Sequence, residues 1–289
     1  MTWLLRSLAK SQMIFSDRSL SRRLERAEAV ANARFVESRA RLMPDSDAQW
    51  IEVAGAYAMY DGVRSPSTQT FGLGLFQMPA PADMDRIEAF FKERGAPVLH
   101  EVSPLADKSL LVVLGERGYR SVELTSVMCL PLNGQFPAAT ARKNAIQVRI
   151  VGDEERDLWA RTAAEGWREF TEIADLMLDL MRVGAAKQDT QSFLAELDGR
   201  PIAAGSLAIH DGVALLAGAS TIPEWRQRGA QRALLESRLE YATRDGCDLG
   251  MICAEPGSAS QRNAERRGFQ IAYTRIKWAL MVPSGPHNP

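Results

Sequence analysis

The chain has 289 residues, of which 46% are hydrophobic and 25% charged, and its formal net charge at pH 7 is −1. This length and composition are typical of a globular protein with two domains of ordinary size, and the near-neutral charge argues against a nucleic-acid partner. No apolar run approaches the roughly 20 residues that a membrane-spanning helix needs, so we expect no membrane association either.

The cysteines and the first residues indicate a cytoplasmic protein. Cys129, Cys247 and Cys253 form an odd set without C-x-x-C spacing, which argues against a disulfide framework and against a zinc site. In residues 1–15, Arg6 and Lys10 interrupt the apolar stretch before the core of a secretory leader could form.

The first half of the chain is predicted to alternate helices and strands. Residues 19–42 place apolar side chains near one side of a helix, and we expect the arginines and glutamates around them to form a solvated face. After Pro44, residues 50–60 and 70–76 are predicted strands joined by a polar turn. The rest of this half is predicted as a helix, a strand, a helix and a strand, over residues 82–94, 98–102, 107–117 and 121–130.

The second half is predicted to follow the same order. An apolar strand over residues 213–219 leads into the basic turn Arg226-Gln227-Arg228-Gly229-Ala230-Gln231, and a helix follows over residues 232–244. A strand over residues 249–254, a small polar turn, a helix, the sequence R-x-G-F and a last strand complete this half. A linker rich in Pro, Gly, Ala and Thr separates the two halves.

The basic turn has the chemistry of a phosphate-binding site. A strand that runs into a tight turn and then a helix leaves backbone N–H groups without partners, and the helix dipole adds partial positive charge there. Gly229 has no side chain to keep an oxygen away from the backbone, and Arg226, Arg228 and Arg232 can balance phosphate charge. An arginine-rich solvated turn is the alternative.

The two halves are related as repeats. Gly95 and Gly246 follow corresponding helices, and Arg117-Gly118-Tyr119 corresponds to Arg267-Gly268-Phe269 about 150 residues later. Where the second half has PEWRQRGAQ, the first has MPAPAD, which contains no glycine or arginine and ends in a carboxylate that would repel phosphate. We therefore expect one phosphate site per chain, in the second half.

The order strand, P-E-x-R-x-R-G, helix, strand, polar turn, helix, R-x-G-F and strand resembles the GNAT superfamily of acyl-CoA-dependent N-acetyltransferases, over residues 145–282. The resemblance implies a mixed α/β sheet and two tandem GNAT-like domains, the first of them degenerate. It implies a division into residues 1–133, a linker at 134–144, a GNAT domain at 145–283 and a tail at 284–289. Arg226 and Gly229 match the family's phosphate motif, whereas Gln231 stands where the family has Gly or Ala.

The resemblance also implies acetyl-CoA as co-substrate and an arrangement of residues around it. The end of the strand offers backbone groups to the pantetheine arm, which lies where this strand splays from the next. The implied cofactor-binding residues are Ala219, Ser220, Thr221, Arg226, Gln227, Arg228, Gly229, Ala230, Gln231, Arg232, Ser258, Ser260 and Arg262. Family members often have a tyrosine as general acid four positions before the glycine of the G-F pair, and that position here is Ala264.

Acetyl transfer to an amine also needs a base and an acceptor site. Glu255, beside the expected thioester position, is the candidate catalytic base, and stabilisation of a helix N-terminus is its alternative role. Trp167 and Glu169 are candidates for binding a cationic amine, with core packing and solvation as their alternative roles. Ser258 and Ser260 are also candidate helix caps. His100 and His210 lack ligands at metal-binding spacing, so no metal is expected.

The predicted function is transfer of an acetyl group from acetyl-CoA to a small amine by direct attack, with a homodimer as an open expectation. One alternative is a non-catalytic acyl-CoA sensor, favoured by Ala264 and Gln231. Another is a separate ligand site in the first half, on the polar strip of residues 65–70, which an ordinary polar loop would also explain.

Overall fold

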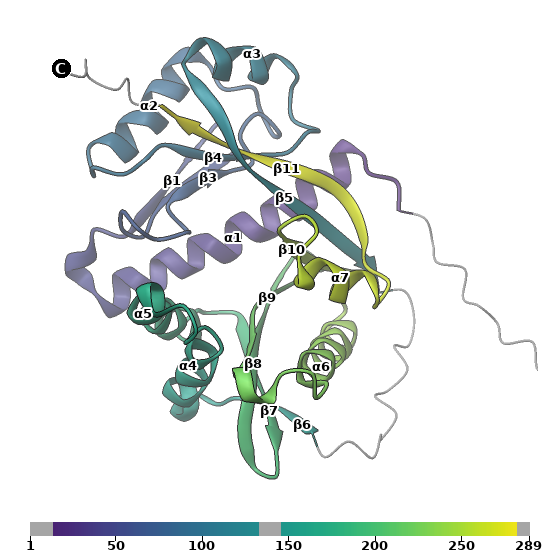
Figure 1. The fold of residues 1–289 in the computed structure, drawn as a ribbon. Helices are drawn as coiled ribbons and strands as arrows, with labels where there is room; N and C mark the ends of the chain where they lie inside the picture. The colour runs from purple at the N-terminus through teal and green to yellow at the C-terminus, as the bar shows by residue number, and fades with distance from the viewer. Residues whose placement is uncertain (1–13, 133–145, 282–289) are drawn as a thin grey trace, which may run out of the picture.

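The computed structural model describes residues 14–132 and 146–281. Its strands form one mixed sheet in the order β1-β2-β3-β4-β11-β5-β10-β9-β8-β7-β6 (Figure 1). The strands of the first half are β1 (Gln49–Val53), β2 (Ala56–Tyr60), β3 (Gln69–Phe71), β4 (Leu99–Val102) and β5 (Tyr119–Pro131). Those of the second are β6 (Ile146–Ile150), β7 (Thr190–Leu197), β8 (Arg200–His210), β9 (Val213–Thr221), β10 (Leu249–Ala254) and β11 (Gln270–Leu280).

The two halves of the chain each contribute their last strand to the centre of the sheet. β5 pairs with β10 from Leu249↔Pro131 to Ala254↔Ser126, and β11 pairs with β4 from Ile276↔Val102 to Ala279↔Leu99. β5 and β11 also pair with each other along most of their lengths, antiparallel. The halves that the sequence separates are therefore joined into one sheet. The predicted linker at 134–144 and the tail at 284–289 lie outside the described residues.

Helices cover both faces of the sheet, and alternating strand residues show which helix covers which face. The helices are α1 (Arg18–Leu42), α2 (Pro81–Lys92), α3 (Ser109–Glu116), α4 (Arg156–Glu165), α5 (Ala174–Ala185), α6 (Ala230–Arg244) and α7 (Ala259–Glu265). On β5, Val127 and Cys129 pack with α1, whereas Met128 between them packs in the core of α6. On β7, Phe193 packs with α6 and Leu194 with α4. The sheet therefore separates α1 and α4 from α6.

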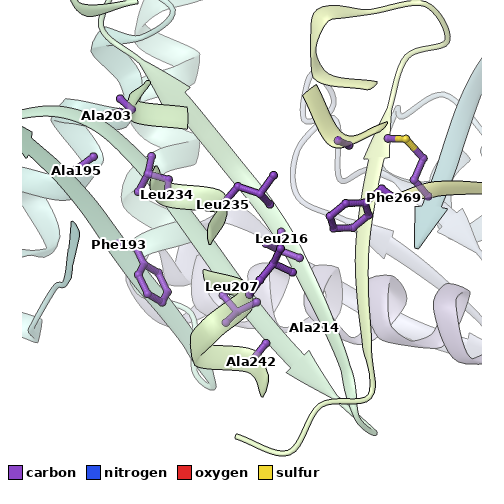
Figure 2. Packing of buried hydrophobic residues seen from close by; sticks show 14 of the residues in the cluster. Phe193, Ala195, Ala203, Leu207, Ala214, Leu216, Leu234, Leu235, Ala242 and Phe269 are labelled. Carbon is purple, nitrogen blue, oxygen red and sulfur yellow. The ribbon is translucent and has the colours of Figure 1, made fainter. Parts of the chain in front are cut away.

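The largest core cluster lies between α6 and the sheet of the second half (Figure 2). Leu234 and Leu235 of α6 pack above Phe193 and Leu207, and Phe269, the residue before β11, joins the cluster. Moving α6 off the sheet would expose its buried leucines to water, which is unfavourable. These apolar contacts therefore fix α6 on the sheet and hold its N-terminal end at the end of β9.

Helix α1 differs from its prediction, because part of its charged face is buried. Glu25 is 0% and Arg39 is 5% exposed. Arg275 of β11 donates to Glu25 at 3.2 Å and to Glu28 at 2.7 Å, and the Tyr273 hydroxyl donates to Glu25 at 2.9 Å. The expectation of a fully solvated face was wrong because these partners lie about 250 residues away in the sequence.

The predicted strands of residues 50–60 and 70–76 also differ in detail. The first is a tight hairpin, β1 and β2, whose turn residues Ala54 and Gly55 have φ of 50° and 77°. The second ends at Phe71, because Gly72 (φ 78°) turns the chain. The strip of residues 65–70 is largely buried, with Thr68 only 1% exposed, so it is not an ordinary solvated loop.

Candidate cofactor and acceptor site

The centre of the site is an opening between the parallel strands β9 and β10. These strands pair only from Leu249↔Val213 to Met251↔Leu215, although β9 continues to Thr221 and β10 to Ala254. Within β9, residues 217–219 are exposed although buried residues flank them on both sides. The strands therefore diverge after Leu215, as the family resemblance implied, and the backbone of residues 217–219 is left accessible.

A bulge in β9 lies at this opening. Ala204 pairs with Ser220 and Ser206 with Ala217, so Gly205 of β8 faces two residues of β9, Gly218 and Ala219. Gly218 has φ of 60°, in the left-handed region that favours glycine. A bulge leaves one residue outside the ladder and bends the strand, which accounts for the loss of pairing with β10.

The predicted phosphate turn lies directly beyond the end of β9. Gln227 and Gly229 have φ of 62° and 94°, and Gly229 is the residue before the first turn of α6, with no side chain capping the helix. Among the described residues, no backbone N–H group of residues 227–232 donates to another protein atom. A Cβ atom placed on Gly229 would meet nothing within 4 Å. These amides are free to bind an anion at a helix N-terminus.

The side chains of this turn have different partners. Arg226 donates to Glu169 at 2.5 Å and to the carbonyl of Gly166 at 2.9 Å, so it ties the turn to the end of α4. Gln231 donates to the Thr221 hydroxyl at 2.9 Å, which directs its side chain back toward β9. The departure from the family motif at Gln231 therefore leaves the turn open.

Arg228 and Arg232 complete the set of cations in the turn. Arg232 is paired with Glu236 one helical turn later, at 2.8 Å. The Arg228 guanidinium lies 4.8 Å from the ring centre of Trp225, and no carboxylate partner for it is present in the described part of the chain. Arg228 is thus the arginine of the turn with a charge available to a ligand.

The predicted residues after β10 lie on the other side of the opening. Glu255 is exposed at the end of β10, next to the turn of residues 256–257. Ser258 caps α7, because its hydroxyl accepts the N–H of Gln261 at 3.2 Å. Ser260 is exposed, as is Arg262. Ala264, at the position of the family's tyrosine, is 2% exposed and belongs to the α6 core cluster.

The candidate acceptor residues follow the C-terminal end of α4. Trp167 is 38% exposed and its ring centre lies 6.1 Å from that of Phe170. The chain approaches β9 closely here, since a Cβ on Gly166 would lie 2.5 Å from the Cβ of Ser220. The Ser220 hydroxyl donates to the carbonyl of Ala163 at 2.7 Å. The structure thus brings the predicted acceptor residue Glu169 and the predicted cofactor residue Arg226 into one ion pair.

The corresponding place in the first half is occupied by its own side chains. The N–H of Ala80, before α2, donates to Asp83 at 2.9 Å, so a carboxylate lies at the helix N-terminus where a phosphate would bind. After β3, Leu73 and Leu75 are both 0% exposed. Arg18 and Arg22 of α1 donate to the carbonyl of Leu75, which fixes this segment against α1.

Two residues near the opening were not predicted from the sequence. Arg238 of α6 and Trp159 of α4 hold the β9 bulge from opposite faces of the sheet, through hydrogen bonds to carbonyls of β8 and β9. Gly218 within the predicted strand of residues 213–219, and Gly205 within the apolar run before it, were a usable signal, because glycine inside a strand often marks a bulge.

Within residues 14–132 and 146–281, no helix is long and apolar enough to cross a membrane. The same residues contain no group of three His, Cys, Asp or Glu side chains arranged to hold a metal ion.

Comparison with known families finds a match for part of the second half. Residues 154–269 match the model of the acetyltransferase (GNAT) family. No curated protein matches the chain.

Several solved structures share the fold of this protein over most of its length. A GCN5-related N-acetyltransferase from Kribbella flavida is 18% identical, with a TM-score of 0.59, over 88% of this chain and 96% of that one. A GCN5-related N-acetyltransferase from Sphaerobacter thermophilus is 15% identical, with a TM-score of 0.53, over 88% and 91%. A tandem GNAT protein of the clavulanic acid biosynthesis pathway is 14% identical, with a TM-score of 0.53, over 79% and 83%. The family match thus lies in the second half, over residues 154–269, and the solved structures share the fold of most of the chain.

Proposed function

We propose that this protein transfers an acetyl group from acetyl-CoA to a small amine, and that its second half holds the acetyl-CoA. The observation that carries the proposal is the run of unpartnered backbone N–H groups at residues 227–232, beside the opening between β9 and β10. An anion-binding turn next to an accessible strand edge suits a ligand with a pyrophosphate at one end and an amide-containing arm at the other.

The residues fit such a ligand. The amides of the turn and the free guanidinium of Arg228 would bind the pyrophosphate. The exposed backbone of residues 217–219 would pair with the amides of the pantetheine arm, as a neighbouring strand would. The thioester would then lie in the opening between β9 and β10.

The chemistry is a direct transfer between two bound substrates. The neutral amine attacks the thioester carbonyl carbon, a C–N bond forms, the C–S bond breaks, the nitrogen loses a proton to solvent to give the amide, and the sulfur leaves as a thiolate. A base must first remove a proton from the ammonium, and Glu255 at the end of β10 is our candidate, acting through water. Since Ala264 supplies no acid, the thiolate takes its proton from solvent.

The acceptor would enter past the end of α4. The exposed rings of Trp167 and Phe170 offer an apolar surface and a face for a cation. Glu169 is already paired with Arg226, so we propose that it positions the phosphate turn as well as attracting an amine.

We also propose that the first half is a degenerate GNAT-like unit that binds no CoA. Asp83 occupies its helix N-terminus and two buried leucines follow its β3. A CoA-binding sensor without catalysis is the second candidate function, and the observation that favours it is the buried alanine at position 264.

An activity screen separates these candidates. The protein is incubated with acetyl-CoA and a panel of small amines, and the products are followed by mass spectrometry. Acetylated amine formed in proportion to enzyme supports the transferase. Binding of acetyl-CoA without any acetylated product across the panel would support the sensor.

A further inference from the structure

A buried arginine lies directly beneath the bulge of β9. Arg238 is 3% exposed, and its guanidinium donates to the carbonyl of Ser206 at 3.0 Å and to that of Ala217 at 3.3 Å. Its Nε donates to the carbonyl of Leu234 in its own helix at 3.2 Å. Arg238 thus connects α6 to both strands at the point where β9 leaves β10.

This side chain is not explained by packing alone. No carboxylate is paired with it among the described residues, and burial lowers its pKa to about 10. A buried charge without a counter-ion is costly unless hydrogen bonds offset the lost hydration. A leucine or methionine would fill the same space on the core side of α6 without that cost.

The surroundings are shaped to admit the guanidinium. A Cβ on Gly205 would lie 3.1 Å from the Arg238 Cζ atom, so the absence of a side chain at this position leaves room for it. On the opposite face of the sheet, Trp159 donates to the carbonyl of Gly205 at 3.3 Å. The Ser206 hydroxyl also donates to the Ala217 carbonyl, at 3.0 Å. The bulge is therefore held by hydrogen bonds from both faces.

We infer that Arg238 is a positioning residue for the pantetheine arm: by holding the Ala217 carbonyl, it keeps the backbone of residues 217–219 turned into the opening between β9 and β10. The inference rests on the proposed function. It assigns to Arg238, in the middle of α6, no contact with the ligand and no part in binding the pyrophosphate, whose proposed amides lie at the N-terminal end of that helix.

The test compares two ligands that differ only in the pantetheine arm. CoA carries the arm, whereas adenosine 3′-phosphate 5′-diphosphate has the nucleotide and the pyrophosphate alone. Calorimetry gives the affinity of each ligand for the wild type, Arg238→Met, Arg238→Lys and the control Arg244→Met. Arg244 lies on the same helix and is solvent-exposed, and within the described residues its one ion pair is with Glu240.

For Arg238→Met we expect CoA affinity to fall at least tenfold while the affinity for the shorter ligand changes by less than twofold. Arg238→Lys, which keeps the charge but offers fewer directed donors, should lie between Arg238→Met and the wild type. Arg244→Met should bind both ligands as the wild type does. Where Arg238→Met does not fold, Arg238→Lys decides, with the same selective loss expected.

Equal losses for both ligands would show a merely structural role and overturn the inference, as would unchanged CoA binding in either folded variant. A wild type that binds the shorter ligand as tightly as CoA would also overturn it, because the arm would then contribute nothing. A wild type that binds neither ligand would contradict the proposed function instead.

Discussion

The substitution Gly229→Asp tests whether the turn before α6 binds phosphate. Gly229 has φ of 94°, and a Cβ there would meet no atom within 4 Å. The folded protein can therefore accept a side chain at the cost of left-handed backbone strain alone, on the order of 1 kcal/mol. The added carboxylate would face the bound pyrophosphate. At about 6 Å and an effective dielectric constant of about 40, each pair of unit charges repels by about 1.4 kcal/mol.

A free-energy loss of that size is about tenfold in affinity, so CoA binding measured by calorimetry should fall tenfold or more. Gly246→Asp is the matched control. Gly246 follows the other end of α6, has φ of 83° and is equally free of neighbours within 4 Å. Thermal unfolding should therefore show similar destabilisation in both variants, with CoA affinity lost in Gly229→Asp alone. Unchanged CoA binding in folded Gly229→Asp would refute the assignment of the phosphate site.

Three further predictions concern stoichiometry, catalysis and pH. Titration should give about one CoA per chain, whereas two equivalent sites would show that the first half had been misinterpreted. Glu255→Gln should keep CoA affinity and lower turnover roughly 100-fold if Glu255 is the base. Full activity in this variant would show that Glu255 only stabilises the N-terminus of α7. Burial raises the pKa of Glu25 from 4.5 to about 7. Because this folded-state pKa lies above the unfolded value, the stability that Glu25 contributes should be lost as pH rises from about 5 through 7. The free energy of unfolding of Glu25→Gln, measured with denaturant across this pH range, should lack this loss. An identical pH dependence in the wild type and the variant would contradict a raised pKa for a buried Glu25.

The sequence was sufficient for the elements that depend on local chemistry. The turn of residues 226–231 combines glycine, arginines and the start of a helix, and local backbone geometry alone dictates what such a turn exposes. The strand of residues 249–254 was placed with the bounds that the structure has. Ser258 as a helix cap likewise follows from short-range hydrogen bonding.

The features that the sequence did not reveal depend on contacts between distant residues. The pairing of β5 with β10 and β11 with β4 requires strands from both halves. No periodicity within either half indicates it. In the same way, Arg226 matched a phosphate motif, but its ion pair with Glu169 depends on where α4 ends. Arg238 is one of many arginines in α6 and its flanks, and only the bulge above it distinguishes it.

The most direct test of the account is a crystal structure of the protein with CoA bound. We expect the pyrophosphate on the amides of residues 227–232 and the pantetheine arm along residues 217–219, in the opening between β9 and β10. CoA bound at the N-terminus of α2 in the first half, or outside the opening, would contradict the central claim that the second half holds the cofactor.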